Sequence, residues 1–291
     1  MRLVTYEYEG KSAVGVMAPQ GDVIVPASQL GFVSNEMQDF IRELSDEKLR
    51  ELPEMAAGKP GLKLSEVKLL APIRFPEHDV VCLGLNYREH AEEAAKADSD
   101  YDQQRGDAVY FGKRVNEAVA PGDPINGNFN IVTQLDYEVE LAVILSKDAK
   151  DVAEKDAMDY VLGYTILNDV SARNLQLKHK QWYFGKCLDG FTPIGPWIVT
   201  RDEIPGNPVL GIRCFVNGEK RQESDTGKLI FDIPYCIAEL SAGMTLQAGT
   251  IISTGTPSGV ALGMDEPKYL KHGDVVRCEI DKIGTLENRV D

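Results

Sequence analysis

Acidic and apolar residues alternate along residues 136–145, which read DYEVELAVIL. Successive side chains of an extended strand point to opposite faces, so Asp136, Glu138 and Glu140 would share one face. The Cα atoms of the two glutamates would lie about 6.6 Å apart, which lets both side chains converge on one hard cation. The alternative is the solvated face of an amphipathic strand, where such like charges repel only weakly.

A third carboxylate, Asp169, stands where the apolar residues 163–167 give way to a polar segment that could begin a helix. It could complete a metal site with Glu138 and Glu140, or either Asp169 or Ser171 could cap that helix. Three oxygen ligands without sulfur or imidazole favour Mg²⁺, Mn²⁺ or Ca²⁺ over zinc, and they leave coordination positions for water and substrate. Carboxylates are therefore the route to metal chemistry that this sequence offers.

His90 and Glu93 stand three residues apart in the polar residues 89–98, whose composition indicates a helix. Residues with this spacing are neighbours on one helix face. A carboxylate bonded to the imidazole would fix its tautomer and stabilise its charged form, so His90 could take a proton from water near neutral pH. The alternative is a surface helix whose histidine is only solvated.

Two further segments carry groups that could contact an anion. Lys186 stands among aromatic and apolar residues in residues 182–196, so it could bind a substrate carboxylate or stabilise an enolate, or its charged end could simply reach solvent. Residues 253–259, STGTPSG, follow a strand-like segment and could offer amides and hydroxyls to an anion. A tight turn between two strands explains them equally well.

Several common catalytic motifs are absent. The sequence has no G-x-x-x-x-G-K-[ST], G-x-G-x-x-G or H-E-x-x-H, and Ser258 lies one place too late for a nucleophile elbow. It has no Cys-x-x-Cys and only four histidines, which argues against structural zinc. A glycosidase pair is disfavoured because Glu138 and Glu140 would lie on one strand with no opposed partner.

Strands dominate the elements that would position these residues. Residues 3–26 alternate and carry two turn signals, which predicts three short antiparallel strands. Residues 34–55 have apolar positions at helical spacing, with Ser34 and Ser45 as candidate N-caps. Further helices are expected at residues 89–98, near Ser171 and at residues 233–242. Apolar runs predict strands at residues 80–85, 139–145, 161–167, 194–200, 212–216, 250–254 and 275–280.

This order is neither a regular strand-helix alternation nor a repeat, so we predict a strand-rich α+β fold. The turn-forming residues 58–61 separate a small N-terminal module from the rest. We place the boundary near residue 70, which gives an N-terminal domain of residues 1–70 and a main domain of residues 71–291.

Composition excludes some classes of partner. Of the 291 residues, 43% are hydrophobic, which suffices for a large core. The 46 acidic and 31 basic residues give a net charge of −15, which repels nucleic-acid phosphates and anionic lipids. No apolar run approaches the ~20 residues that span a bilayer, and the first residues lead into a strand pattern rather than an export signal. The five dispersed cysteines suit free thiols in a reducing compartment, so we expect a cytoplasmic protein without nucleic-acid or membrane partners.

Taken in order, five motifs resemble those of the fumarylacetoacetate hydrolase family. They are GLNY with the following His90, DYEVEL at 136–141, NDVSAR at 168–173, Gly185-Lys186, and GTPSGV at 255–260. The resemblance covers about residues 70–290, and the preceding module resembles the small N-terminal domain of many bacterial members. It implies a mixed β-sandwich roll, a homodimer, and one Mg²⁺ or Mn²⁺ per site, with Ca²⁺ possible in a crystal.

The resemblance also implies roles for individual residues. By position, Glu138, Glu140 and Asp169 match the metal carboxylates, and His90 with Glu93 matches the histidine-glutamate pair on the family's lid helix. The residues implied on the substrate side are Lys186, Gln176, Gly255 and Thr256. We find no counterpart of the additional metal aspartate of the eukaryotic namesakes, so the chain looks closer to acylpyruvate-hydrolase-like and 2-hydroxyhepta-2,4-diene-1,7-dioate isomerase-like bacterial members.

For function, the resemblance implies metal-dependent hydrolysis of a carbon-carbon bond in an acylpyruvate or related 2,4-dioxo acid. The metal would chelate the 2-oxo acid, and His90, oriented by Glu93, would activate water. Lys186 would then help the metal to stabilise the departing enolate. Without the activated water, the same chemistry gives an oxaloacetate-type decarboxylase or a 2-hydroxydienoate isomerase. A ligand-binding protein without catalysis is disfavoured because both His90 and Glu93 are present.

Residues 89–107 contain few large apolar side chains. A helix with so few apolar anchors gains little from packing, so we expect this segment to be an open or frayed lid when the site is empty. Closure would bring His90 over the substrate.

Overall fold

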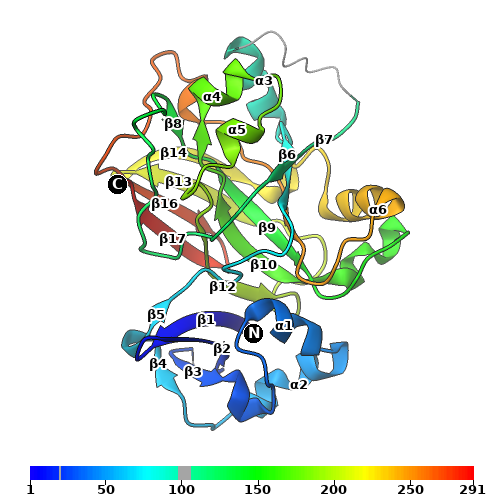
Figure 1. The fold of residues 1–291 in the computed structure, drawn as a ribbon. Coiled ribbons are helices and arrows are strands. Elements are labelled where there is room, and N and C mark those ends of the chain that lie inside the picture. The colour runs from blue at the N-terminus through cyan, green and yellow to red at the C-terminus, as the bar shows by residue number, and fades with distance from the viewer. Residues whose placement is uncertain (20, 98–105) are drawn as a thin grey trace.

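The computed structural model describes residues 1–19, 21–97 and 106–291 (Figure 1). Its large mixed sheet has the strand order β4-β3-β2-β1-β12-β10-β9-β15-β6-β7, with β5 paired to β1. The pair β15 and β6 is parallel, and the other pairs are antiparallel. The strands are β1 (Arg2–Tyr8), β2 (Lys11–Met17), β3 (Val23–Pro26), β4 (Leu62–Lys63), β5 (Lys68–Leu69), β6 (Val80–Gly84), β7 (Val109–Lys113), β9 (Val139–Leu145), β10 (Val161–Asn168), β12 (Ile194–Thr200) and β15 (Ile251–Ser253).

A second, antiparallel sheet has the order β14-β13-β16-β17. Its strands are β13 (Gly211–Val216), β14 (Glu219–Asp225), β16 (Val275–Ile280) and β17 (Gly284–Arg289), and a separate short pair joins β8 (Leu135–Asp136) to β11 (Ser171–Ala172). The helices are α1 (Met37–Glu43), α2 (Asp46–Ala56), α3 (Arg88–Ala97), α4 (Arg173–Lys178), α5 (Tyr183–Lys186) and α6 (Ile233–Gly243). Short 3₁₀ turns are η1 (Ala27–Leu30), η2 (Leu64–Glu66), η3 (Glu154–Tyr160), η4 (Thr226–Lys228) and η5 (Ala261–Gly263).

Strand β9 lies between two clusters of buried apolar side chains. All seven of its residues are buried. Val139, Leu141 and Val143 pack with side chains of the four-stranded sheet in one cluster, whereas Ala142 and Ile144 pack with residues of the N-terminal module in another. A strand covered on both faces reads as a continuous apolar run, as β9 does from residue 141 onward.

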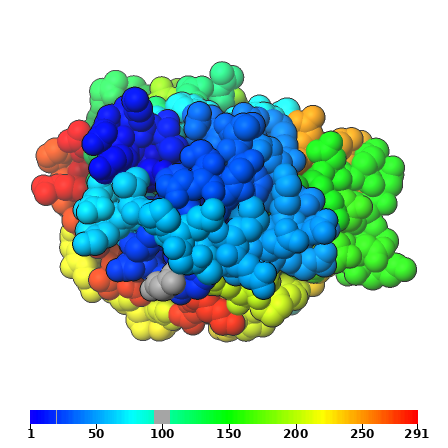
Figure 2. Space-filling model, turned by 90° about the horizontal axis from the view of Figure 1, so that it is seen from below, coloured from blue at the N-terminus to red at the C-terminus, as the bar shows by residue number. Residues whose placement is uncertain are grey.

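The N-terminal residues cover one end of the molecule (Figure 2), and α3, α4 and α5 gather at the opposite end (Figure 1). Strand β1 pairs with β12, so the large sheet continues from the N-terminal module into the main part of the chain. The chemistry-bearing residues considered above lie on or beside these three helices, at the ends of β9 and β10, and in the loop after β15. They therefore lie at the end away from the N-terminal module.

The predicted strand-rich α+β fold is confirmed, and so are the three N-terminal strands and the seven later ones, to within about a residue or two at their ends. The helical character expected for residues 34–55 is confirmed, and it is divided between α1 and α2. Ser45 caps the second through the Lys48 amide, as expected, but Ser34 does not cap the first, which begins at Met37. The Ser34 hydroxyl bonds to Glu43 instead.

The helix expected near Ser171 begins two residues later, because residues 171–172 pair with β8. Strands β7, β14 and β17 were not predicted. Within the residues described, no helix combines the length and the apolar character that crossing a membrane requires.

Candidate active site

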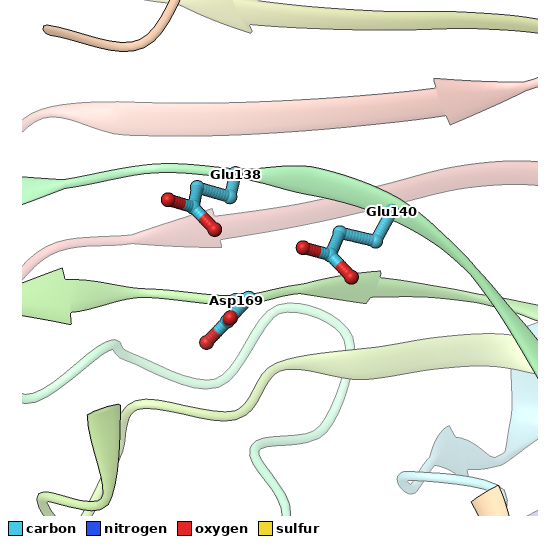
Figure 3. Close-up of side chains that lie close together, drawn as sticks. All are labelled: Glu138, Glu140 and Asp169. Carbon is cyan, nitrogen blue, oxygen red and sulfur yellow. The ribbon is translucent and has the colours of Figure 1, made fainter. Parts of the chain in front are cut away.

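Three carboxylates meet at the ends of the two central strands (Figure 3). Glu138 immediately precedes β9, Glu140 lies within it, and Asp169 immediately follows β10. The pairing of these strands places Leu167 beside Glu140, and the Asp169 amide donates to the Glu138 carbonyl at 2.8 Å. One ligand oxygen from each carboxylate lies within 4.8 Å of the others, and all three residues are at most 4% exposed. The solvated-face alternative for Glu138 and Glu140 is therefore wrong.

The helix-cap alternative for Asp169 and Ser171 is also wrong. The N-cap of α4 is Ala172, without a capping side chain. Asp169 is fully buried, and the Ser171 hydroxyl donates to the Asp169 carbonyl. Asp169 therefore directs its carboxylate into the cluster and not toward the amides of α4.

Buried cations surround two of these carboxylates. The Lys186 ammonium lies 2.8 Å from Glu138 Oε2 and 2.6 Å from Asp169 Oδ2. The Arg173 guanidinium reaches Glu138 Oε1 at 2.6 Å. Lys186 is 2% exposed, so the expected alternative of a lysine reaching solvent is wrong.

The local charges set the pKa values of the two glutamates apart. Burial raises the pKa of Glu138, but Lys186 and Arg173 outweigh it and hold the pKa at about 2. Burial together with the negative charges of Asp169 and Glu138 raises the pKa of Glu140 to about 8. Ionisation is therefore favourable for Glu138 and unfavourable for Glu140, because the cations of the cluster lie beside Glu138.

The C-terminal loop supports Glu140 through hydrogen bonds. The Ser253 hydroxyl and the Gly255 amide donate to Glu140 Oε2 at 2.5 Å and 2.9 Å. The Thr256 hydroxyl donates to the Val139 carbonyl at 2.9 Å. These donors are engaged with the chain itself, so this loop does not present them freely to an anion as its sequence suggested.

His90 lies on α3 with its Nδ1 3.3 Å from Glu93 Oε2. Its side chain is 9% exposed, so the solvated-helix alternative is wrong. Both carboxylate oxygens of Glu93 also accept from the Gly259 amide, at 3.1 Å each. Glu93 therefore orients the imidazole and connects α3 to the C-terminal loop.

A small cavity of about 30 Å³ lies between α3, α5 and the carboxylates. Its polar lining consists of His90, Glu138, Glu140, Arg173, Gln176, Lys186 and Thr256. Its apolar lining includes Leu83, Leu85, Phe111, Trp182 and Leu262. The structure thus brings all nine expected site residues together: six line the cavity, and Asp169, Glu93 and Gly255 each bond to one of those six.

Three buried groups of the site were not predicted. Arg173 bonds to Asp136, Glu138 and Gln176, although it was visible only as the last residue of NDVSAR. Asp136 accepts the amides of residues 261 and 262 and so fixes the C-terminal loop. Lys113, at the end of the unpredicted strand β7, contacts Asp169 at 2.7 Å. The polar end of the run VYFGK was the one available signal.

The donor set fits a hard divalent cation. It offers three buried carboxylates and neither sulfur nor imidazole among the clustered ligands, which matches the preference of Mg²⁺, Mn²⁺ and Ca²⁺. The Lys186 ammonium already lies between Glu138 and Asp169, so these oxygens are arranged around positive charge.

Comparison with known proteins gives a consistent set of relatives. The family model described as "Fumarylacetoacetate (FAA) hydrolase C-terminal" matches residues 79–291. The Bacillus subtilis (strain 168) protein named oxaloacetate tautomerase YisK is 44% identical over 238 residues, 82% of this chain and 78% of that protein. The Xenopus laevis protein named mitochondrial oxaloacetate tautomerase fahd2 is 42% identical over 232 residues, 79% of this chain and 70% of that protein.

A solved structure from Sphingobium sp. SYK-6, a maleylpyruvate hydrolase in complex with manganese (II) ion and pyruvate, superimposes with a TM-score of 0.79. It is 30% identical in sequence, and the match covers 100% of this chain and 98% of that one.

Proposed function

The chain belongs to the fumarylacetoacetate hydrolase family, and we propose that it is a divalent-metal-dependent enzyme that enolises a small 2-oxo acid. One observation carries the proposal. The buried carboxylates of Glu138, Glu140 and Asp169 surround a common space beside a cavity that also holds His90 and Lys186. A buried acidic cluster next to a candidate proton carrier is the arrangement that metal-assisted enolisation needs.

When bound, Mg²⁺ or Mn²⁺ would polarise the 2-oxo group of the substrate. The positive charge of Lys186 lies at the cavity wall, where it would offset negative charge that develops on the oxo oxygen. Gln176 accepts from Arg173 through Oε1, so its amide nitrogen is left to donate toward the substrate.

His90 would carry the proton. Because Nδ1 faces Glu93, Nε2 is the nitrogen available to the cavity. It would remove a proton from C3 of the 2-oxo acid and return it to the oxo oxygen, and the Glu93 carboxylate would stabilise the imidazolium in between. This sequence of proton transfers interconverts the keto and enol forms without consuming water.

Among the reactions that share this enolate, we propose keto-enol tautomerisation of an oxaloacetate-type acid. Two relatives above 40% identity carry that name. Hydrolysis of an acylpyruvate is the second candidate. The related maleylpyruvate hydrolase structure with manganese and pyruvate favours it.

A substrate panel tests the proposal. Protein stripped by chelation and reloaded with Mn²⁺ is mixed with the enol form of oxaloacetate and with short acylpyruvates, and both tautomers and released pyruvate are followed. We expect faster interconversion of oxaloacetate that disappears on chelation and returns with Mn²⁺. Pyruvate together with a free acid would instead identify a hydrolase. Absence of any metal-dependent reaction across the panel would overturn the proposed function.

A further inference from the structure

Lys113 is a fully buried lysine behind the carboxylate cluster. It ends β7, and its ammonium lies 2.7 Å from Asp169 Oδ1. The same ammonium donates to the Val170 carbonyl at 3.1 Å and to the Lys186 carbonyl. Two of its three N–H donors are thus taken by backbone carbonyls, and its positive charge lies against the Asp169 carboxylate.

Lys113 and Lys186 contact opposite oxygens of Asp169. Lys186 lines the cavity and takes Oδ2, whereas Lys113 is absent from the cavity lining and takes Oδ1. Lys113 is fully buried and does not line the cavity, so it does not reach a substrate there. Its contacts instead join three segments: strand β7, the turn that carries Asp169, and the end of α5 that carries Lys186.

We propose that Lys113 is a positioning residue that holds Asp169 as a metal ligand. Because the Lys113 ammonium contacts Oδ1 on the side away from the cavity, Asp169 keeps Oδ2 turned toward the space that it shares with Glu138 and Glu140. Partners that orient a metal ligand in this way typically alter metal affinity by 10- to 100-fold. The inference rests on the proposed metal site.

Electrostatics and positioning make opposite predictions for the variant Lys113→Met. Loss of one positive charge beside Asp169 would, by charge alone, strengthen binding of a divalent cation. Loss of the contact between Lys113 and Asp169 would free the Asp169 side chain and weaken binding of the cation. We expect weaker binding, by about tenfold or more, in a calorimetric titration of metal-free protein with Mn²⁺.

Three further variants test whether a change in Mn²⁺ affinity is specific to the contact between Lys113 and Asp169. Lys150→Met removes a lysine that bonds to two backbone carbonyls outside the site, and it should bind Mn²⁺ normally. Lys186→Met keeps Asp169 held by Lys113, so its Mn²⁺ affinity should be unchanged or higher although turnover falls. Asp169→Asn should weaken binding, and adding Lys113→Met to it should weaken binding little further, because both changes act through one carboxylate.

Measurement of turnover distinguishes a residue that only positions a metal ligand from one that takes part in the reaction. At saturating Mn²⁺, Lys113→Met should recover turnover close to that of the unsubstituted protein, whereas Lys186→Met should not. Equal losses of affinity in both lysine variants, or unchanged or tighter Mn²⁺ binding by Lys113→Met, would overturn the inference. Failure of the unsubstituted protein to bind Mn²⁺ would instead count against the proposed function.

A measurement that leaves Lys113 in place covers the case in which Lys113→Met does not fold. Protein labelled with ¹⁵N-lysine should show a slowly exchanging ammonium resonance from Lys113, identified because it persists in Lys186→Met. It should remain protected and shift when Mg²⁺ is added. An ammonium signal that is absent, or that does not respond to Mg²⁺ while the protein binds it, would overturn the inference.

Discussion

Glu138 and Glu140 are two residues apart and almost equally buried, yet their pKa values move in opposite directions. Glu138 has two cations beside it, whereas Glu140 has a hydroxyl, an amide and two negative neighbours. Among the described residues of the site, four buried carboxylates face three buried cations: Asp136, Glu138, Glu140 and Asp169 against Lys113, Arg173 and Lys186. Within this described set, the buried acids outnumber the buried cations by one, and Glu140 is the acid without a cation bonded to it.

The carboxylates of the site were predictable from the sequence, but the buried cations beside them, Lys113 and Arg173, were not. Carboxylates at Glu138, Glu140 and Asp169 stood out by strand period and by their place at element ends. Lys113 and Arg173 show no such pattern, because a buried cation is recognisable only from the acids that tertiary folding brings to it.

The pair His90 and Glu93 yields a prediction at this scale. His90→Ala and Glu93→Ala should each lower kcat by roughly 10²- to 10⁴-fold with the metal still bound, the usual range for a positioned acid-base group. The two losses should be non-additive, because Glu93 acts through His90. Steady-state kinetics on Mn²⁺-loaded protein measures both.

His78→Ala is the matched control, since His78 is an exposed histidine bonded to Gln247. It should leave kcat unchanged. Normal turnover in both His90→Ala and Glu93→Ala would remove the pair from the mechanism.

At the scale of elements, the fully buried apolar strands were predictable, whereas the polar edge strands β14 and β17 were not. Strands β9 and β10 are buried on every residue, so hydrophobicity marks them directly. Strands β14 and β17 carry mostly polar residues, EKRQESD and GTLENR, and form the two edges of the smaller sheet. Their strand conformation is fixed by pairing with β13 and β16, which a local pattern does not contain.

Helix α3 is held over the site by its contact with the C-terminal loop. Besides the Gly259 bond, Glu93 packs on Gly263, where an added Cβ would come within 1.9 Å of Glu93 Cγ. Residues 98–105 of the expected lid, residues 89–107, lie outside the described residues. The contacts of Glu93 with Gly259 and Gly263 are what dock α3 on the C-terminal loop, and the lid motion stays a prediction.

Gly263→Ala should displace α3 while leaving the metal ligands intact. We expect faster amide exchange in α3 and lower kcat, with unchanged Mn²⁺ affinity, by hydrogen-exchange mass spectrometry and titration. Gly243→Ala is the control, because a Cβ there meets nothing within 4 Å. Unaltered exchange and kcat in Gly263→Ala would argue against a docked α3 as a requirement for turnover.

At the scale of the whole molecule, one sheet connects the N-terminal module to the site. Strand β1 pairs with β12, β12 with β10, and Asp169 follows the end of β10. The boundary near residue 70 is a sequence prediction, and the chain contributes strands to a common sheet on both sides of it. The homodimer and the cytoplasmic location stay predictions.

The metal ligands are the central claim, and direct titration with Mn²⁺ tests them most directly. Chelator-stripped protein should bind one Mn²⁺ per chain, with Glu138→Gln, Glu140→Gln and Asp169→Asn each weakening binding by about tenfold or more because each removes a charged ligand. Glu239→Gln, a carboxyl bonded to Tyr110 and Tyr235 outside the cluster, should bind normally. Absence of stoichiometric Mn²⁺ binding, or binding that survives all three substitutions, would contradict the account.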